Sequence, residues 1–134
     1  MDSPRCLDGF YRLKAEPRVY IAGQLSGVEG YIESVASGFY AGLHAACALK
    51  DIPFTPLPRT TAVGALAAYV SDGSVRDFQP MNINFGLIEP LGERVGGKKN
   101  RNLAISNRSL EIIENITAGF SSKAQSKDSS MHSE

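Results

Sequence analysis

Hydrophobic and polar positions near the start of the chain predict one short strand followed by a long helix. Residues 18–22 lie between Pro17 and Gly23 and after Arg18 are β-branched, aromatic or small, which predicts a buried strand. Residues 31–49 repeat apolar side chains at helical spacing, which predicts a helix. Its apolar positions are Ile32, Val35, Ala36, Phe39, Leu43 and Ala46. The helix also has a second stripe made of small residues, and it carries few polar side chains. This indicates that other parts of a protein cover it on more than one side.

The segment between the predicted strand and helix is rich in glycine. Gly23, Gly27 and Gly30 fall within eight residues, which lets a backbone take positive φ or approach another surface closely. In α/β proteins, a strand, a glycine-rich turn and a helix together hold phosphate-bearing cofactors at the positive helix N-terminus. The spacing differs from the dinucleotide-binding pattern G-x-G-x-x-G. The pattern alone therefore fits a tight turn before a close-packed helix equally well.

The remaining elements are predicted from the positions of proline, glycine and apolar residues. Three prolines make residues 51–59 an extended crossing. A helix over about 61–70 follows, capped by Thr60 or Thr61. Residues 75–91 are irregular or form short strands. Residues 93–102 form a loop that is rich in glycine and in basic residues. A last helix over about 102–118 has an apolar arc of Ile105, Ile112, Ile113, Ile116 and Phe120.

The end of the chain lacks any apolar period. Six of the fourteen residues from Ser121 onward are serine, and this composition is typical of disorder. The expected organisation is therefore one globular segment over residues 1–120 and a disordered serine-rich tail over residues 121–134.

Composition and charge describe a globular protein without a global electrostatic signature. Hydrophobic residues make up 43% and charged residues 21%, and fourteen basic residues balance fourteen acidic ones. Contact with RNA would therefore depend on local patches. The candidates are Lys98, Lys99 and Arg101 in the basic loop, and Arg59 beside a predicted helix start. Ordinary solvated surface residues fit the same pattern.

The cysteines and histidines match no metal-site spacing. Cys6 and Cys47 are far apart, as are His44 and His132, so no metal is expected. Cys47 lies in an alanine-rich run and is expected to be a small buried hydrophobe. The sequence has neither an apolar run long enough to span a bilayer nor an export signal, so a cytoplasmic protein without a membrane partner is expected.

Three separated motifs resemble one family. Residues 22–34 read A-G-Q-L-S-G-V-E-G-Y-I-E-S, residues 58–66 read P-R-T-T-A-V-G-A-L, and residues 78–87 read F-Q-P-M-N-I-N-F-G-L. Together with residues 2–7, they resemble the folate- and FAD-dependent tRNA uracil-5-methyltransferases over about residues 2–118. The larger flavoprotein that installs carboxymethylaminomethyl groups on tRNA uridine is a more distant resemblance, because its sequence differs after A-G-Q.

The resemblance implies an α/β fold, namely the C-terminal part of an FAD/NAD(P)-binding Rossmann-like flavoprotein domain that is incomplete in this chain. In the family, reduced FAD accepts a methylene group from methylenetetrahydrofolate and passes it to carbon 5 of the T-loop uridine. NAD(P)H is the reductant. By resemblance, the cofactor-binding residues are Gly23, Gln24, Gly27, Val28, Glu29, Gly30, Tyr31 and Ser34.

The departures from the family pattern are as important as the matches. The FAD fingerprint and the region with the catalytic cysteine have no counterpart, and neither Cys6 nor Cys47 falls at a catalytic position. No catalytic residue is therefore assigned, and the chain is expected to be inactive alone. The expected partners are the T-arm of tRNA and the missing N-terminal half of the same protein. The alternative is a truncated, non-catalytic remnant that binds RNA or a partner.

Overall fold

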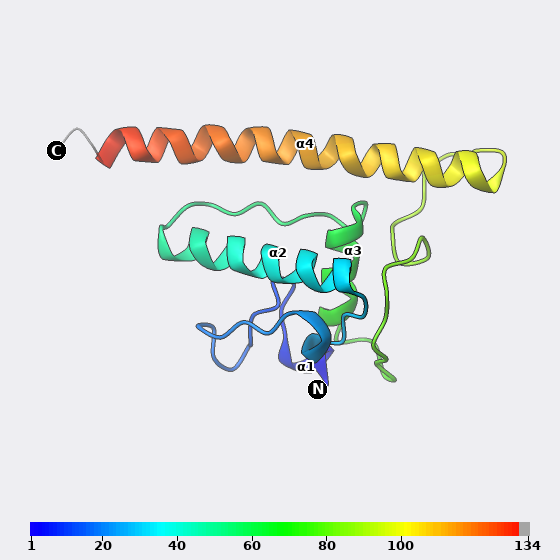
Figure 1. Cartoon of the computed structure of the whole chain (residues 1–134), viewed down its shortest axis with the longest axis horizontal. Coiled ribbons are helices and arrows are strands. Elements are labelled where there is room, and N and C mark those ends of the chain that lie inside the picture. The colour runs from blue at the N-terminus through cyan, green and yellow to red at the C-terminus, as the bar shows by residue number, and fades with distance from the viewer. Residues whose placement is uncertain (132–134) are drawn as a thin grey trace.

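The computed structural model describes residues 1–131, without the side chains of residues 124, 127, 128 and 131, and the regular elements in that range are helices. In chain order they are α1 (Ser3–Cys6), the 3₁₀ helix η1 (Gly23–Ser26), α2 (Tyr31–Leu49), α3 (Ala62–Ser71) and α4 (Lys98–Met131). Figure 1 shows α4 running along one side of the molecule, with α2, α3 and the N-terminal segment on its other side.

The strand predicted at residues 18–22 is wrong. Tyr20 forms one isolated antiparallel bridge with Arg12. Two backbone hydrogen bonds hold this segment, from the Leu13 N–H to the Val19 carbonyl at 2.9 Å and from the Ile21 N–H to the Tyr11 carbonyl at 2.8 Å. A regular strand requires a continuous ladder to a neighbour, and residues 1–131 supply only single bridges. The predicted α/β Rossmann-like class is therefore not confirmed.

Helix α2 confirms the prediction for residues 31–49, but its burial differs from the prediction. Its buried residues are Ser37, Tyr40, Ala41 and Cys47. The predicted apolar positions Ile32, Val35 and Phe39 are 82%, 72% and 71% exposed. The chain packs η1 and α3 against one side of α2, and this leaves the predicted apolar stripe uncovered.

Helix α3 confirms the predicted helix at residues 61–70 and selects Thr61 as its cap. The Thr61 side chain accepts a hydrogen bond from the Gly64 N–H at 3.1 Å, which is the usual capping geometry. The core forms where α3 meets α2 and the N-terminal segment. It contains Tyr11, Val28, Tyr40, Ala41, Leu66, Ala67 and Val70.

Helix α4 is longer than predicted at both ends. Lys98 to Asn102, predicted as loop, form its first turns, and the Arg101 N–H donates to the Gly97 carbonyl at 3.0 Å. The described part of the predicted disordered tail, residues 121–131, continues the helix. Serine hydroxyls there bond to helix carbonyls one turn earlier, such as Ser129 to Gln125 at 3.1 Å. Residues 132–134 of the predicted tail lie outside the described residues.

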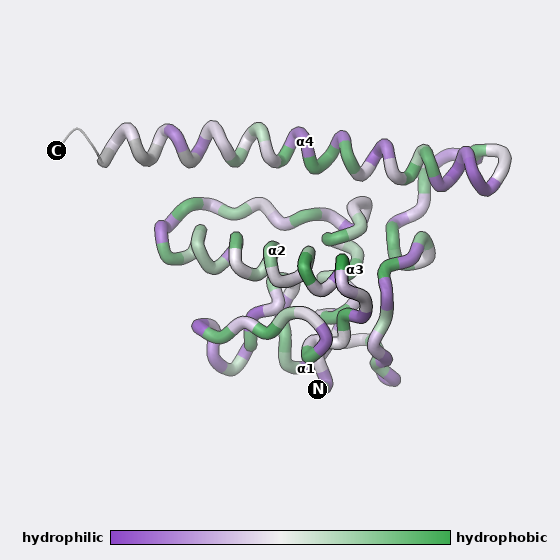
Figure 2. The backbone as a smooth tube through the Cα atoms, viewed as in Figure 1, coloured by the Kyte–Doolittle hydropathy of each residue, from purple (hydrophilic) through white to green (hydrophobic). Residues whose placement is uncertain are grey.

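One end of α4 is attached to the body of the protein. Ile105 is buried against Ala65 and Ile88, and the Arg108 guanidinium donates to the carbonyl oxygens of Glu89 and Pro90. Figure 2 shows the far end of α4 as mostly hydrophilic or neutral, consistent with the absence of an apolar period there. No helix within residues 1–131 is both long and apolar enough to cross a membrane.

Candidate functional site

The glycine-rich loop has the backbone geometry expected of it. Gly23, Gly27 and Gly30 have φ values of 69°, 88° and 94°, in the positive range that favours glycine. Gly27 ends the short helix η1, and Gly30 is the N-cap of α2. The loop therefore delivers the chain directly into the N-terminus of α2, and no glycine of the loop lies in the middle of a helix.

The third motif holds this loop in place. Val28 and Met81 form a parallel bridge, in which the Glu29 N–H donates to the Met81 carbonyl at 3.1 Å and the Met81 N–H donates to the Gly27 carbonyl at 3.0 Å. The Glu33 carboxylate accepts from the Ile83 N–H at 3.4 Å. Residues about 50 positions apart in sequence are thus joined at the start of α2.

Two loop glycines are packed too closely to carry a side chain. A β-carbon on Gly27 would lie 2.5 Å from the Phe78 ring. A β-carbon on Gly30 would collide with the Glu33 carboxylate and lie 2.7 Å from the Asn82 amide nitrogen. The space beside Gly30 is therefore filled by Glu33 and Asn82, so contact of this loop with a ligand depends on its other side.

The other side of the loop is open. Tyr31 is 93% exposed and Leu25 is 67% exposed, and Gln24 and Glu29 are also exposed. Gly30 makes no side-chain cap, and the first N–H groups of a helix have no acceptor within the helix. Within the described residues, the α2 N-terminus thus presents uncapped N–H donors beside an exposed aromatic ring.

The eight predicted cofactor residues lie around the start of α2, but their side chains differ in direction. Val28 is fully buried in the core, so only its backbone can face a ligand. The Gly23 N–H donates to the Ser37 hydroxyl at 3.0 Å, and that hydroxyl donates to the Ser34 carbonyl at 2.9 Å. The Ser34 backbone carbonyl therefore supports the loop, whereas the side chains of Gln24, Glu29 and Tyr31 are exposed.

A cavity of about 130 Å³ lies where the three motifs meet. It is lined by four residues of α2, three residues of α3 and two residues outside these helices, namely Ile32, Glu33, Ala36, Ser37, Ala62, Val63, Leu66, Tyr11 and Ile83. The Tyr11 side chain is fully buried, has φ of 63°, and its hydroxyl has no hydrogen-bond partner among residues 1–131. Burial raises the pKa of the Tyr11 phenol, and the neighbouring Tyr40 adds to this. Ligand pockets usually measure about 300–1,000 Å³, so this cavity cannot enclose a flavin ring.

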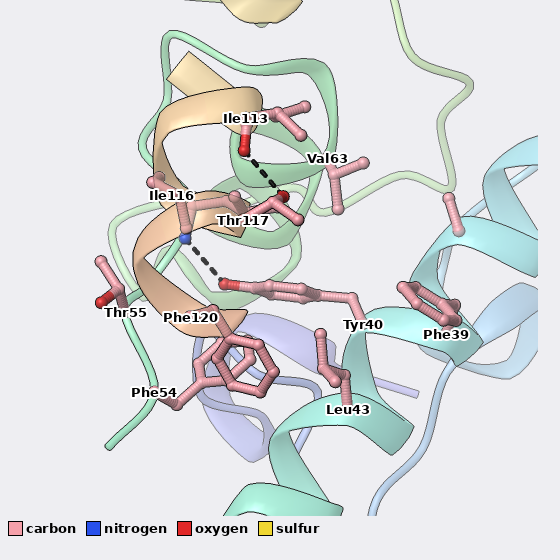
Figure 3. Close-up of a pocket in the computed structure, with 12 residues that line it drawn as sticks. Phe39, Tyr40, Leu43, Phe54, Thr55, Val63, Ile113, Ile116, Thr117 and Phe120 are labelled. Carbon is pink, nitrogen blue, oxygen red and sulfur yellow. Dashed lines mark hydrogen bonds between the residues drawn. The ribbon is translucent and has the colours of Figure 1, made fainter. Parts of the chain in front are cut away.

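A larger cavity of about 390 Å³ lies between α2, residues 54–57 and α4 (Figure 3). Its walls are mostly apolar and include Phe39, Phe54 and Phe120. Its polar side chains include Tyr40, whose hydroxyl accepts from the Leu57 N–H at 3.0 Å, and Thr117, which donates to the Ile113 carbonyl at 2.8 Å. Because both hydroxyls are already hydrogen-bonded, this cavity has few free polar groups for a substrate. We therefore assign the functional site to the glycine-rich loop, where the three motifs meet.

The predicted RNA-binding residues separate into two places. The first turns of α4 expose Lys98, Lys99 and Arg101 together. The first turn of this helix contains no acidic residue. Arg59 is exposed just before α3, and its backbone carbonyl accepts from the Glu89 N–H at 2.9 Å. Three of the four cations therefore form one patch at the positive end of a helix dipole.

The described residues contain no group of three His, Cys, Asp or Glu side chains placed to hold a metal. Cys47 is 2% exposed, which confirms its prediction as a buried hydrophobe, and burial raises the pKa of its thiol. Cys6 is half-buried.

Sequence reasoning missed several residues that build the site. Glu33, Phe78 and Asn82 lie inside the quoted motifs, but no signal in the sequence showed that the first and third motifs touch. Tyr11 lies in no motif, and its burial depends on packing between α2 and α3.

Comparison with known proteins connects these motifs to one enzyme name. Residues 1–53 match the family model described as glucose inhibited division protein A. The methylenetetrahydrofolate–tRNA-(uracil-5-)-methyltransferase TrmFO of Acetivibrio thermocellus is 43% identical over 121 residues, covering 90% of this chain and 28% of that protein. The proteins of the same name from Syntrophotalea carbinolica and Streptococcus pneumoniae are each 48% identical, covering 85% of this chain and 25% and 26% of their own length.

The chain thus spans about a quarter of the length of the curated relatives that it matches. The matched stretch covers most of the chain, as the three motifs predicted. Over 85–90% of its length, the chain resembles a segment of the methylenetetrahydrofolate–tRNA-(uracil-5-)-methyltransferases.

Proposed function

We propose that residues 1–120 form part of the FAD-binding domain of a flavin-dependent tRNA methyltransferase. The enzyme transfers a methylene group from methylenetetrahydrofolate to carbon 5 of the T-loop uridine of tRNA, with NAD(P)H as reductant. In this proposal, residues 23–34 lie along one edge of the flavin. The names of the relatives support the reaction, and the geometry of the loop supports the role of this segment.

The observation that carries the proposal is the uncapped N-terminus of α2 beside Tyr31. Gly30 supplies no capping side chain, and the Glu33 carboxylate in the first turn is engaged by Ile83 and Asn82. The free N–H groups and the helix dipole favour an acceptor or a negative charge at this point. A flavin ring has carbonyl acceptors on one edge and carries negative charge when reduced, so the chemistry of this helix end fits it.

The size of the site limits what this segment contributes. The enclosed cavity of about 130 Å³ is too small for the ring, whereas the outer side of the loop is open at Gln24, Glu29 and Tyr31. The residues present therefore fit one edge of the isoalloxazine and not a whole FAD. When bound, FAD supplies the electrons and carries the one-carbon unit.

The chain's own residues would orient the cofactor rather than react with it. Positive φ at Gly27 and Gly30 sets the direction of the loop, and two backbone hydrogen bonds join it to Met81. The exposed Tyr31 ring offers a flat apolar surface for the cofactor ring. No residue among those described is assigned as nucleophile or general base.

We propose that Lys98, Lys99, Arg101 and Arg59 contact phosphates of tRNA. The three residues in the first turns of α4 combine side-chain charge with the positive end of the helix dipole, which favours phosphate. A non-catalytic RNA-binding protein is the second candidate, because this patch does not depend on a cofactor.

A chimera tests the proposed function. The matching segment of the Acetivibrio thermocellus relative is replaced by this chain, and the purified protein is assayed for bound FAD and for 5-methyluridine in tRNA. The proposal expects flavin-loaded, active protein, and the isolated chain given FAD, methylenetetrahydrofolate and NADH should form no 5-methyluridine. A folded chimera that binds tRNA but holds no flavin would favour the second candidate.

A further inference from the structure

The side of α2 that points away from the core is unusually apolar for a surface. We define the outer face of α2 by its exposed large residues Tyr31, Ile32, Val35, Phe39 and Leu49, together with the small residues Gly38, Gly42 and Ala46. Tyr31 is 93% and Leu49 is 87% exposed. A helix facing water normally carries charged residues on its outer side. This face has none over the whole length of α2.

The small residues of the outer face are as informative as the large ones. A β-carbon added to Gly38 or Gly42 would meet no atom within 4 Å. These glycines are therefore not required by packing within the described chain. Glycine in the middle of a helix costs stability, so its presence on an open face indicates that another backbone approaches there.

We propose that the outer face of α2 packs against the part of the methyltransferase relatives that lies outside the stretch matched by this chain. This proposal rests on the proposed function, since the occupant is the remainder of that flavoprotein. The matched stretch is 25–28% of the relatives' length, so roughly three quarters of each relative is available to cover the face. The face begins at Tyr31, beside the uncapped helix end, so its occupant would also adjoin the cofactor edge.

Residues 1–131 leave most of this face exposed. Helices η1 and α3 contact α2 on its opposite side, together with loop residues such as Phe10, Leu57 and Ile83. The cavity beside α4 is bounded on the α2 side by Ala36, Phe39, Tyr40 and Leu43, of which Phe39 belongs to the outer face. Val35 lies near the centre of the face and is 72% exposed. A change at Val35 therefore separates the outer face from the internal packing of the chain.

Val35→Glu is compared in the isolated chain and in the chimera with the Acetivibrio thermocellus relative. The proposal expects no change of Tm in the isolated chain and a drop of roughly 5 °C or more in the chimera, because a charge would be buried without a partner. Lys123→Glu, on the exposed end of α4, is the matched control and should not change the Tm of the isolated chain or of the chimera. The proposal would be overturned if Val35→Glu changed the Tm of neither protein, or lowered the Tm of both by the same amount. A chimera that fails to fold would also overturn it.

Thiol labelling gives a second measurement that does not depend on destabilisation. The thiol introduced by Val35→Cys should react with a maleimide in the isolated chain and be protected on the order of tenfold in the chimera. Equal protection in both, with a dimer of the isolated chain in sedimentation, would overturn the proposal in favour of a second copy as occupant. Protection in a chimera that holds no FAD would uphold this interface and reject the proposed function.

Discussion

The ring of Phe78 lies against Gly27, where a β-carbon would come within 2.5 Å of it. Gly27 also has φ of 88°, so two separate costs oppose a side chain there. We expect Gly27→Ala to lower the free energy of unfolding by about 1–2 kcal/mol from the backbone conformation, with about 1–3 kcal/mol more from overpacking.

Removing the ring separates these two costs. In a Phe78→Ala background, Gly27→Ala should retain only the backbone part of its effect. Urea unfolding of the two single variants and the double variant measures the difference. If the effect of Gly27→Ala were the same in both backgrounds, the close contact with Phe78 would not be real.

Gly64 and Gly38 are both helical glycines, but their surroundings are opposite. A β-carbon on Gly64 would collide with the backbone carbonyls of Leu57 and Pro58, whereas one on Gly38 meets nothing within 4 Å. We expect Gly64→Ala to destabilise the chain by about 1–3 kcal/mol, because a backbone cannot move aside as a side chain can. Gly38→Ala should stabilise it by about 0.5–1 kcal/mol.

Thermal or urea unfolding of both variants tests this contrast. Destabilisation by Gly38→Ala in the isolated chain would mean that the outer face of α2 is already packed.

His44 links stability to pH. Its ring stacks on Phe10 with centroids 4.0 Å apart, and its Nδ1 lies 2.9 Å from the Tyr20 hydroxyl. Burial lowers the pKa of His44, and the charge of Arg12 lowers it further, while Asp8 opposes this. The unfolded chain then binds the proton more readily. His44 therefore stabilises the fold fully above its unfolded pKa of about 6.5, and this stability is lost as pH falls below that value.

Urea unfolding at pH 7.5 and 5.5 measures this contribution. The loss of stability between the two should be smaller in His44→Gln than in the unchanged chain. A larger loss in the variant would reverse the sign assigned to His44.

The basic first turns of α4 should contribute to RNA affinity through phosphates. Changing Lys98 and Lys99 to Glu should weaken tRNA binding by the chimera and reduce the slope of log affinity against log salt by about 1 for each phosphate that is no longer neutralised. Filter binding at several salt concentrations measures this, with Lys123→Glu as the control. An unchanged salt slope would remove these residues from the RNA surface.

Helices with a strong apolar period could be predicted from the sequence, and the strand could not. The apolar spacing within residues 31–49 and the Thr61 cap correspond to α2 and α3 in the structure. A strand is defined by its neighbours, and residues 18–22 have one short antiparallel partner in the described chain. The extent of α4 also escaped prediction, because its last turns have no packing face and depend on local hydrogen bonds.

The site could be predicted only in part. The positive φ values of Gly23, Gly27 and Gly30 agree with the glycine pattern. Which side of the loop is open could not be read from the sequence, since it is set by Glu33, Asn82 and Phe78 packing on the other side. For this reason Gly30 is a poor test of cofactor contact: its substitution would disturb Glu33 and Asn82 first.

Tyr31 provides the most direct test of the account, because it is 93% exposed and its removal should leave the fold of the chain intact. In the chimera, we expect Tyr31→Ala to weaken FAD affinity by about tenfold, or about 1.4 kcal/mol, while circular dichroism stays unchanged. Lys123→Ala should have no effect. The measurement is the flavin-to-protein absorbance ratio after gel filtration at a fixed FAD concentration near half-saturation. Full flavin content in Tyr31→Ala would contradict the claim that residues 23–34 lie along the cofactor.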